Sequence, residues 1–397
     1  MKIINGEILS RTDISCLEQF FHANTEDFLF FDIETTGLSA RNCICYLIGC
    51  VFFKDNVFLY RQYFAELPEQ EKDIITQFLM FVKNFKYIVH FNGDSFDIPF
   101  LKERVRLLKI NENPDNNNEF TTIDNIYIDN IAGIDLFKTV KSLSSILKLP
   151  NYRQKTVENL LGLSRDDIFS GGDLIQTYQE YLKVYLLYEK THDEALSKDI
   201  DEKLAAILLH NHDDIAALPQ IASLFCCKVF LDGGFTVEKS FVSSSKPHNS
   251  NCITKQAVFV LKSDFSVPKE LSYKNEIYSL SILQDNATLE VPMYTGELKY
   301  FYKNYKDYYY LPEEDTAIHK SVAFYVDKNH RIQAKASNCC SKKAGTFLPQ
   351  LTETETPCFK FEYSDKTTYF LADDNFFNNT DRINNYVKAL IKDLIKN

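Results

Sequence analysis

Two acidic residues stand one residue apart in an apolar stretch of the chain. In "FFDIETTGLS", Asp32 and Glu34 interrupt a run from Phe28 to Ile33 that is otherwise typical of a buried strand. Residues i and i+2 of a strand point to the same face, so the two carboxylates project together. Carboxylates held this close repel each other unless they are protonated or bridged by cations. A single pair of this kind could also be an exposed strand end without chemistry.

Two further acidic motifs follow. In "HFNGDSFDIPFL", Asn92 and Gly93 indicate a turn and Asp97 opens a predicted helix. An acid at a helix N-terminus more often caps the helix than binds a ligand. Further on, "LLHNHDDIAAL" adds two adjacent acids, Asp213 and Asp214. Three acidic motifs together indicate a constellation that could bind metal ions.

Helical periodicity selects one of these adjacent acids. The predicted helix over 204–218 places its apolar residues on one face: Leu204, Ile207, Leu208, Ile215 and Leu218. Asp214 and His210 lie one turn apart on a flank of that face, whereas Asp213 is expected to point away into solvent. A ligand must reach the sheet that carries Asp32 and Glu34. The periodicity therefore favours Asp214 as the ligand.

The elements that would position these residues alternate between strands and helices. Strands are predicted at 28–34, 45–53, 57–63 and 87–91, and "EKDIITQFLMFVKNF" has the period of a helix. A second helix follows Asp97, and the Asn-rich segment Asn111–Phe120 is a predicted loop. From Lys138 to Leu224 the pattern indicates successive helices, interrupted at Gly171–Gly172. This order predicts an α/β fold with a mixed sheet.

The remainder of the chain has a different character. Short β-rich runs such as "QAVFVLKS" and "SVAFYVD" predict antiparallel strands, and "DRINNYVKALIKDLIKN" predicts a terminal helix. We therefore expect an α/β domain over residues 1–227 and a β-rich domain of unknown role over residues 228–397.

The three motifs "DIETTGL", "NGDSFDIPFL" and "HNHDDIAAL" resemble the exonuclease motifs of the DEDD, DnaQ-like nucleases, which have a ribonuclease-H-like fold. The intervening "DLFKTVKSLSSILKLPNYRQKTVENLLGLSR" and "GGDLIQTYQEYL" are similar to segments of the YprB-like branch. The resemblance covers roughly residues 25–225 and does not extend to the C-terminal part. It implies a 3′–5′ exonuclease that hydrolyses single-stranded DNA or RNA by a two-metal mechanism.

The resemblance also implies roles for single residues. Four acids would hold two Mg²⁺ or Mn²⁺ ions: Asp32, Glu34, Asp97 and Asp214. Asp32 would bridge both ions, Glu34 and Asp214 would complete one site, and Asp97 would hold the other ion, partly through water. Six residues would line the pocket of the terminal nucleotide or contact the strand: Thr35, Thr36, Gly37, Leu38, Asn92 and Phe96. Leu38 would act as an apolar wedge.

His210 departs from the family pattern. The YprB-like branch has tyrosine four residues before the last aspartate, which is the position of His210. The other large branch has histidine five residues before it, which would be Leu209. A histidine can orient or deprotonate the attacking water, so we count His210 among the catalytic residues and leave its role open. We interpret His212 as structural.

Charge and aromatic content leave other functions open. The net charge of −11 argues against a simple electrostatic binder of nucleic acid. The stretch from Lys138 to Lys155 is nevertheless basic, with Phe137 just before it and Tyr152 within it, and "KYFYKNYKDYYYL" mixes the same residue types. Such mixtures fit a single strand, although a solvated face or a Tyr-rich strand explains them equally well.

Two alternatives to an exonuclease remain. One is a nucleic-acid-binding or scaffold protein on a degenerate nuclease fold, against which the presence of all four carboxylates argues. The other is an endonuclease or phosphatase that uses the same acids. The choice between DNA and RNA, the oligomeric state and any protein partners stay open.

The N-terminal sequence and the cysteine spacing indicate the compartment and the redox chemistry of the protein. The start "MKIINGEILSRTD" lacks a secretory pattern, and no segment approaches about 18 consecutive apolar residues. We expect a cytoplasmic protein without membrane contact. The ten cysteines are scattered without a C-x-x-C pair, which argues against a zinc ribbon. The adjacent Cys339 and Cys340 leave a redox pair as a minor alternative.

Overall fold

The computed structural model describes residues 1–9, 12–110, 131–167, 169, 171–245 and 254–396. The chain divides into two compact units. The first comprises Met1–Ser144 and Lys148–Cys226, and the second takes Ser145–Leu147 and the chain from Cys227 on. The loop predicted at Asn111–Phe120 lies outside the described residues.

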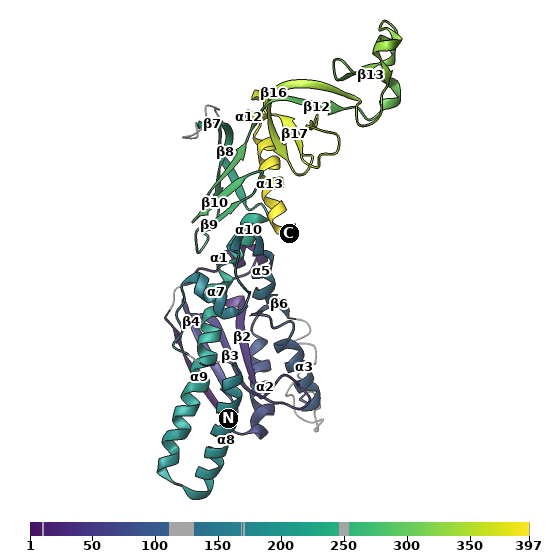
Figure 1. The fold of residues 1–397 in the computed structure, drawn as a ribbon. Helices are drawn as coiled ribbons and strands as arrows, with labels where there is room; N and C mark the ends of the chain where they lie inside the picture. The colour runs from purple at the N-terminus through teal and green to yellow at the C-terminus, as the bar shows by residue number, and fades with distance from the viewer. Residues whose placement is uncertain (10–11, 111–130, 168, 170, 246–253, 397) are drawn as a thin grey trace, which may run out of the picture. The chain divides into compact units, whose positions relative to one another are not determined.

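A six-stranded mixed sheet forms the centre of the first unit (Figure 1). Its order is β1 (Lys2–Ile8), β4 (Val57–Phe64), β3 (Cys45–Lys54), β2 (Phe28–Thr35), β5 (Tyr87–His90) and β6 (Ala132–Asp135). The pairs from β1 to β2 are antiparallel, whereas β2–β5 and β5–β6 are parallel. The predicted α/β architecture with a mixed sheet is therefore confirmed.

Helices cover the sheet and bury its central strands. The first eight residues of β3 are all buried, because α2 (Glu71–Val82) and α9 (Glu194–Ala222) both pack against this strand. A strand covered on both faces has no polar alternation, which explains the continuous apolar run. Helix α8 (Gly171–Thr191) packs along α9 and adds Tyr178, whose ring stacks on Tyr46 at 4.0 Å. This core keeps the strands that carry the acidic motifs rigid.

Several elements of the first unit differ from prediction. Strands β1 and β6 were not predicted, because β1 is largely exposed on both faces and β6 has four residues. Helix α3 (Asp97–Leu107) begins at the predicted acid, and α8 begins at Gly171. Its other described helices are short: α1 (Ser15–Phe21), α5 (Leu136–Ser142) and α7 (Gln154–Leu161), whereas α6 (Ser144–Leu147) and α10 (Phe225–Leu231) lie mostly in the second unit.

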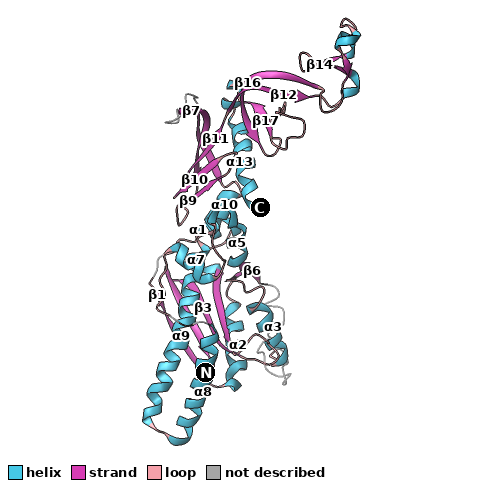
Figure 2. Cartoon of the chain, viewed as in Figure 1, coloured by secondary structure: helices cyan, strands magenta, loops and turns pink. Residues whose placement is uncertain are grey.

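The second unit is built mainly from antiparallel strands (Figure 2). Its largest sheet has the order β7 (Phe235–Ser245), β8 (Thr254–Ser263), β11 (Asn286–Pro292), β10 (Ser279–Leu283) and β9 (Leu271–Lys274). Helix α13 (Thr380–Lys396) packs on it through Tyr386, whose ring contacts Phe259. The predicted β-rich C-terminal part with its terminal helix is confirmed.

Two three-stranded sheets complete this unit. One has the order β12 (Tyr294–Phe301), β16 (Cys340–Gln350) and β17 (Thr368–Leu371), and the other has β14 (Thr316–His319), β13 (Tyr308–Leu311) and β15 (Ile332–Gln333). Four of the six tyrosines of "KYFYKNYKDYYYL" pack against a small core of Ala317, Ala334 and Cys339: Tyr302, Tyr305, Tyr308 and Tyr310. This packing accounts for the Tyr-rich segment without nucleic acid.

Two further expectations concern chemistry outside the acidic motifs. Cys339 and Cys340 are buried, and burial raises the pKa of Cys339 to about 11, so both stay thiols and the redox alternative is disfavoured. One helical stretch, Glu194–Leu231, is long and apolar enough by composition to cross a membrane. Of its most apolar window, 67% is buried inside the protein, which is the placement of a core helix.

Candidate active site

Strand β2 carries the first two acids to the centre of the sheet. Asp32 and Glu34 are half-buried, and Ile33 between them is buried. Asp32 lies opposite Gly49 of β3, where a side chain would collide with Asn211 of α9: an added Cβ would lie 2.0 Å from its Oδ1. The glycine therefore lets α9 approach β2, and Asn211 Nδ2 donates to Asp32 Oδ2 at 3.4 Å.

Asp97 reaches the same place from the start of α3. Its carboxyl lies near its own backbone N–H and near that of Ile33, which lies between the first two acids, and both N–H groups act to lower its pKa. The preceding turn allows this approach, because a Cβ on Gly93 would lie 3.0 Å from Asp97 Oδ2 and closer still to the His90 ring. The second acidic motif is thus joined directly to the first.

Helix α9 brings the third motif to β2. His210 Nε2 lies 3.3 Å from Asp214 Oδ2 and 4.0 Å from Glu34 Oε1. The predicted Asp32, Glu34, Asp97, His210 and Asp214 therefore meet at one site, although they come from three separate parts of the chain.

The acids of this site perturb one another. Burial raises the pKa of Asp32 well above its usual range, and the charges of Asp97, Asp214 and Glu34 raise it further. Burial also raises the pKa of Glu34, again with Asp214 and Asp97 adding to it. The pKa of Asp97 rises to about 7, chiefly through burial. Crowded carboxylates of this kind are stabilised as anions when cations sit between them.

Within the described part of the chain, two groups of side chains could hold an ion. Glu34, His210 and Asp214 each offer one ligand atom within 4.8 Å of the others, and this mixture of carboxylate and imidazole suits a divalent metal ion. The set fits the metal ions that the acidic motifs imply.

The second group comprises His90, Asp94 and Asp135. Here His90 Nδ1 accepts a hydrogen bond from the Gly93 N–H at 3.1 Å, so neutral His90 carries its proton on Nε2. Lys138 Nζ, in turn, lies 2.5 Å from Asp94 Oδ2. A protonated nitrogen and a neighbouring ammonium group make this a poor metal site.

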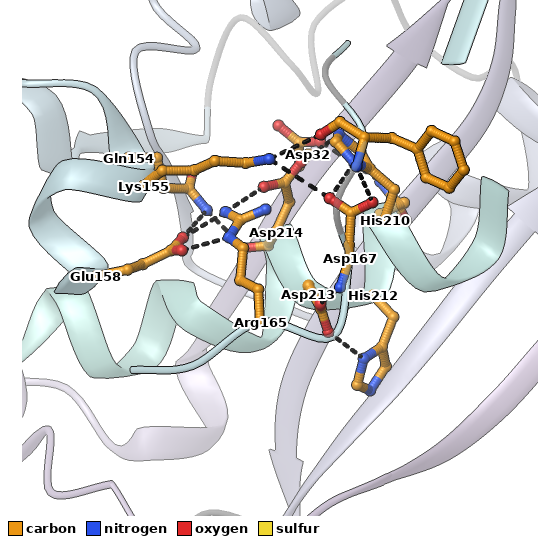
Figure 3. A network of polar contacts seen from close by, with 12 residues as sticks. Asp32, Gln154, Lys155, Glu158, Arg165, Asp167, His210, His212, Asp213 and Asp214 are labelled. Atoms are coloured by element: carbon orange, nitrogen blue, oxygen red, sulfur yellow. Dashed lines mark hydrogen bonds and ion pairs between the residues drawn. The ribbon is translucent and has the colours of Figure 1, made fainter. Parts of the chain in front are cut away.

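The segment between α7 and α8 contributes residues that the sequence alone did not reveal (Figure 3). Arg165 Nη2 lies 2.5 Å from Asp214 Oδ1, and its guanidinium is also held by Glu158 of α7. Asp167 Oδ2 lies 2.6 Å from His210 Nδ1. Arg165 ends the quoted segment "DLFKTVKSLSSILKLPNYRQKTVENLLGLSR", and Asp167 lies just beyond it, but contacts between distant segments leave no periodic pattern that would single them out.

Asp213 corrects a prediction. It was expected to point into solvent, but its side chain is only 13% exposed and its Oδ2 accepts the backbone N–H groups of Asp166 and Asp167, both at 3.0 Å. The reason is that the α7–α8 segment covers this flank of α9, which helical periodicity cannot show. His212 contacts Asp213 and the ring of Tyr60, in agreement with a structural role.

Comparison with known proteins identifies the domain. Residues 29–226 match the RNase_H superfamily. The first unit carries an RNase_H superfamily domain. The match confirms the ribonuclease-H-like fold that the motifs predicted. No curated protein matches the sequence.

Solved structures show weaker likeness to this chain. One is the family B DNA polymerase of the archaeon Pyrobaculum calidifontis, at 15% identity and a TM-score of 0.31, covering 70% of this chain and 35% of the polymerase. Another is the zinc-bound complex of E. coli exonuclease I with single-stranded DNA, at 13% identity and a TM-score of 0.26, covering 60% and 55%. The chain thus spans about a third to about half of these proteins, and the low scores carry no argument about function.

The six residues that were predicted to bind the substrate differ in their exposure and in their hydrogen bonds. The Thr35 hydroxyl donates to the Gly37 carbonyl, and the Thr36 hydroxyl accepts from the Ile44 N–H, so both stabilise the β2–β3 connection. Phe96 is half-buried against Phe100. Leu38 is 87% exposed and Asn92 is also exposed.

The basic stretch from Lys138 to Lys155 is partly engaged within the chain. Lys138 pairs with Asp94, and Lys155 Nζ lies 3.5 Å from Asp167 Oδ2. Lys141 lies over the ring of Phe137. These contacts favour a structural contribution from the stretch over a free cationic surface.

Proposed function

We propose that the RNase H domain is a Mg²⁺- or Mn²⁺-dependent nuclease of the YprB-like branch of the DEDD nucleases, and that it removes nucleotides from the 3′ end of single-stranded DNA or RNA. One observation carries this proposal: four carboxylates converge on one site, where burial raises the pKa of each and the charge of Asp214 raises that of the other three. Such a site is costly without cations and suits phosphodiester chemistry with them.

The four acids would divide the work of holding two ions. Asp32, Glu34, Asp97 and Asp214 would be the ligands, with Asp32 shared. When bound, the ions would lower the pKa of an attacking water and stabilise the negative charge on the leaving oxygen. Without them the acids would repel a phosphodiester, so we expect cleavage to depend strictly on divalent cations.

Other residues of the domain would position the nucleic acid. The exposed Leu38, which follows β2, is available as an apolar wedge against the terminal base. Asn92 and Phe96 stand in the turn before Asp97 and would contact the strand beside the scissile bond. Thr35, Thr36 and Gly37 would shape the pocket through the β2–β3 connection.

The test is a cleavage assay with the purified full-length protein. Single-stranded DNA and RNA, labelled at the 5′ or the 3′ end, are incubated with Mn²⁺, Mg²⁺ or EDTA, and the products are resolved by length. We expect stepwise shortening from the 3′ end with metal and none in EDTA. Cleavage of a circular single strand would indicate an endonuclease instead. If no substrate were cut with either metal, the proposal would be wrong.

A second candidate is a nucleic-acid-binding protein with little or no cleavage. It is favoured by the ion pair between Arg165 and Asp214, which occupies one oxygen of an expected ligand. A protein of this kind would bind labelled oligonucleotides in fluorescence anisotropy but leave them intact with Mn²⁺. Incubation of labelled oligonucleotides with Mn²⁺ therefore distinguishes the two candidates.

A further inference from the structure

We propose that His210 is itself a metal ligand, binding one ion through Nε2 together with Glu34 and Asp214, and that Asp167 holds the imidazole in the tautomer that this requires. The inference rests on the proposed function and deepens it, because it concerns the identity of the metal. It gives His210 a role different from that of a base acting on water.

Asp167 decides which nitrogen of His210 carries the proton. Its side chain is fully buried, and Oδ2 lies 2.6 Å from His210 Nδ1. Its Oδ1 accepts the Phe169 N–H at 2.8 Å, and Lys155 Nζ lies 3.5 Å from Oδ2. In the tautomer with the proton on Nδ1, His210 donates to Asp167 and directs the lone pair of Nε2 toward Asp214 and Glu34. Metal-binding histidines typically have such a carboxylate on the other nitrogen.

The surroundings of Nε2 suit a cation. Its polar neighbours are Asp214 Oδ2 at 3.3 Å and Glu34 Oε1 at 4.0 Å, both acceptors. A lone pair that faces two carboxylates is repelled by them unless a cation lies between the three groups. The three ligand atoms lie within 4.8 Å of one another, close enough to share one ion.

Arg165 leaves only one oxygen of Asp214 for this ion. Its Nη2 pairs with Oδ1, whereas Oδ2 faces His210. Glu158 holds the guanidinium in place from α7 (Figure 3). Asp213 fixes the backbone of the same segment by accepting the N–H groups of Asp166 and Asp167. Three consecutive residues, 165–167, thus orient both the histidine and the aspartate of α9.

A nitrogen ligand has a consequence for metal choice. Mg²⁺ prefers surroundings made of oxygen, whereas imidazole favours transition-metal ions. We therefore expect this site to bind Mn²⁺ more tightly than Mg²⁺, with a preference that depends on His210. A coordinated Nε2 cannot also accept a proton from water.

Pulsed electron paramagnetic resonance tests the ligand directly. The full-length protein, unlabelled or labelled with ¹⁵N-histidine, is loaded with one equivalent of Mn²⁺. We expect modulation from a directly coordinated imidazole nitrogen that changes with the ¹⁵N label. His210→Gln should lose this modulation, and His212→Gln, two residues along the same helix, should keep it.

Calorimetry provides a second readout that does not depend on activity. Asp167→Asn should weaken Mn²⁺ binding about 10- to 100-fold, the range typical of a lost carboxylate partner of a metal-binding histidine. Mg²⁺ binding should change less. If His210→Gln does not fold, Asp167→Asn tests the inference in its place through this loss of Mn²⁺ affinity.

The outcomes separate the inference from the proposed function. If the protein degrades oligonucleotides and binds Mn²⁺ without nitrogen modulation, His210 is not a ligand, while the nuclease proposal stands. If Asp167→Asn leaves the affinity for Mn²⁺ unchanged, the role of Asp167 is wrong. If the protein binds no divalent cation at all, both proposals fall.

Discussion

Two sets of buried acids in the first unit differ in how their charge is balanced. Glu71 of α2 is buried, accepts from Arg104 Nε at 2.7 Å and from the Cys45 N–H at 2.8 Å, and so finds its partners within the chain. At the acidic site Asp97 is buried and Asp32 is half-buried, yet no ion pair with a basic side chain is found for either among the residues that the structure describes. The charge of Glu71 is compensated by a direct ion pair, whereas Asp32 is compensated only from a distance, by the charge of Arg165.

This difference distinguishes structure from function. A buried ion pair is costly to break because the remaining partner keeps its charge without solvent. A cluster of buried carboxylates without a cation destabilises the folded state, and the raised pKa values express that cost. We infer that the Glu71–Arg104 pair holds α2 against α3, and that the acidic site is completed only by a ligand.

The largest expected effect is on the compensated pair. Arg104→Met should lower the free energy of unfolding by about 3–5 kcal/mol, because it leaves Glu71 charged and buried. Urea denaturation measures this loss. Arg106→Met, which breaks the exposed pair with Glu103 on the same helix, is the control and should leave the denaturation midpoint nearly unchanged. If both variants lost the same free energy of unfolding, the buried pair would stabilise the fold no more than the exposed pair.

At the acidic site, replacing a charged side chain should lower the cleavage activity but not the free energy of unfolding. Asp32→Asn should reduce cleavage at least about a hundredfold, which corresponds to ~2.7 kcal/mol in the transition state. The free energy of unfolding without metal should stay equal or rise, because one of several crowded charges is gone. A variant that keeps more than a few per cent of the wild-type rate would contradict the metal-ligand role of Asp32.

The pH dependence of stability should show the uncompensated charge. Folding raises the pKa of Asp97 to about 7, so between about pH 4 and 7 the folded state binds a proton that the unfolded state has lost. In EDTA the stability contributed by protonated Asp97 should therefore be full below about pH 4 and decline as the pH rises through 7.

Asp97→Asn is the matched variant for this effect, because it cannot lose that proton. Relative to the wild type it should gain roughly 1–3 kcal/mol between pH 4.5 and pH 8, since each pKa unit corresponds to about 1.4 kcal/mol. Urea denaturation at the two pH values gives the difference. A constant difference would show that Asp97 titrates normally. Saturating Mn²⁺ should abolish the decline in the wild type.

The smallest expected effect concerns Asp213, which stabilises the site without belonging to it. Asp213→Ala removes the acceptor for two backbone N–H groups, so Asp167 should shift and kcat/KM should fall about tenfold, or ~1.4 kcal/mol. Asp213→Asn keeps a carbonyl acceptor and should retain most activity, whereas Asp214→Asn should lose it. Similar losses in Asp213→Asn and Asp214→Asn would show that both acids bind metal.

Much of the fold could be predicted because its signals are local. The apolar run around Asp32, the helical period after Glu71 and the β-rich runs beyond Cys227 each reflect burial along one element. The convergence of the acidic motifs also followed from the sequence, since strand alternation directs Asp32 and Glu34 to one face and helical period directs Asp214 toward the sheet. Strand β1 escaped prediction because its exposed residues carry no periodic apolar signal.

Only the tertiary structure decided how the acids are partnered. Residue types determined that carboxylates and a histidine would meet, because their spacing follows from the backbone geometry of single elements. Whether Asp213 faces solvent, whether Asp214 is paired and which nitrogen of His210 is free depend on the segment 165–167, which reaches α9 from a distant part of the sequence. Charge compensation acts through space, so what packs beside an aspartate decides whether it accepts from the backbone, as Asp213 does, or pairs with an arginine, as Asp214 does.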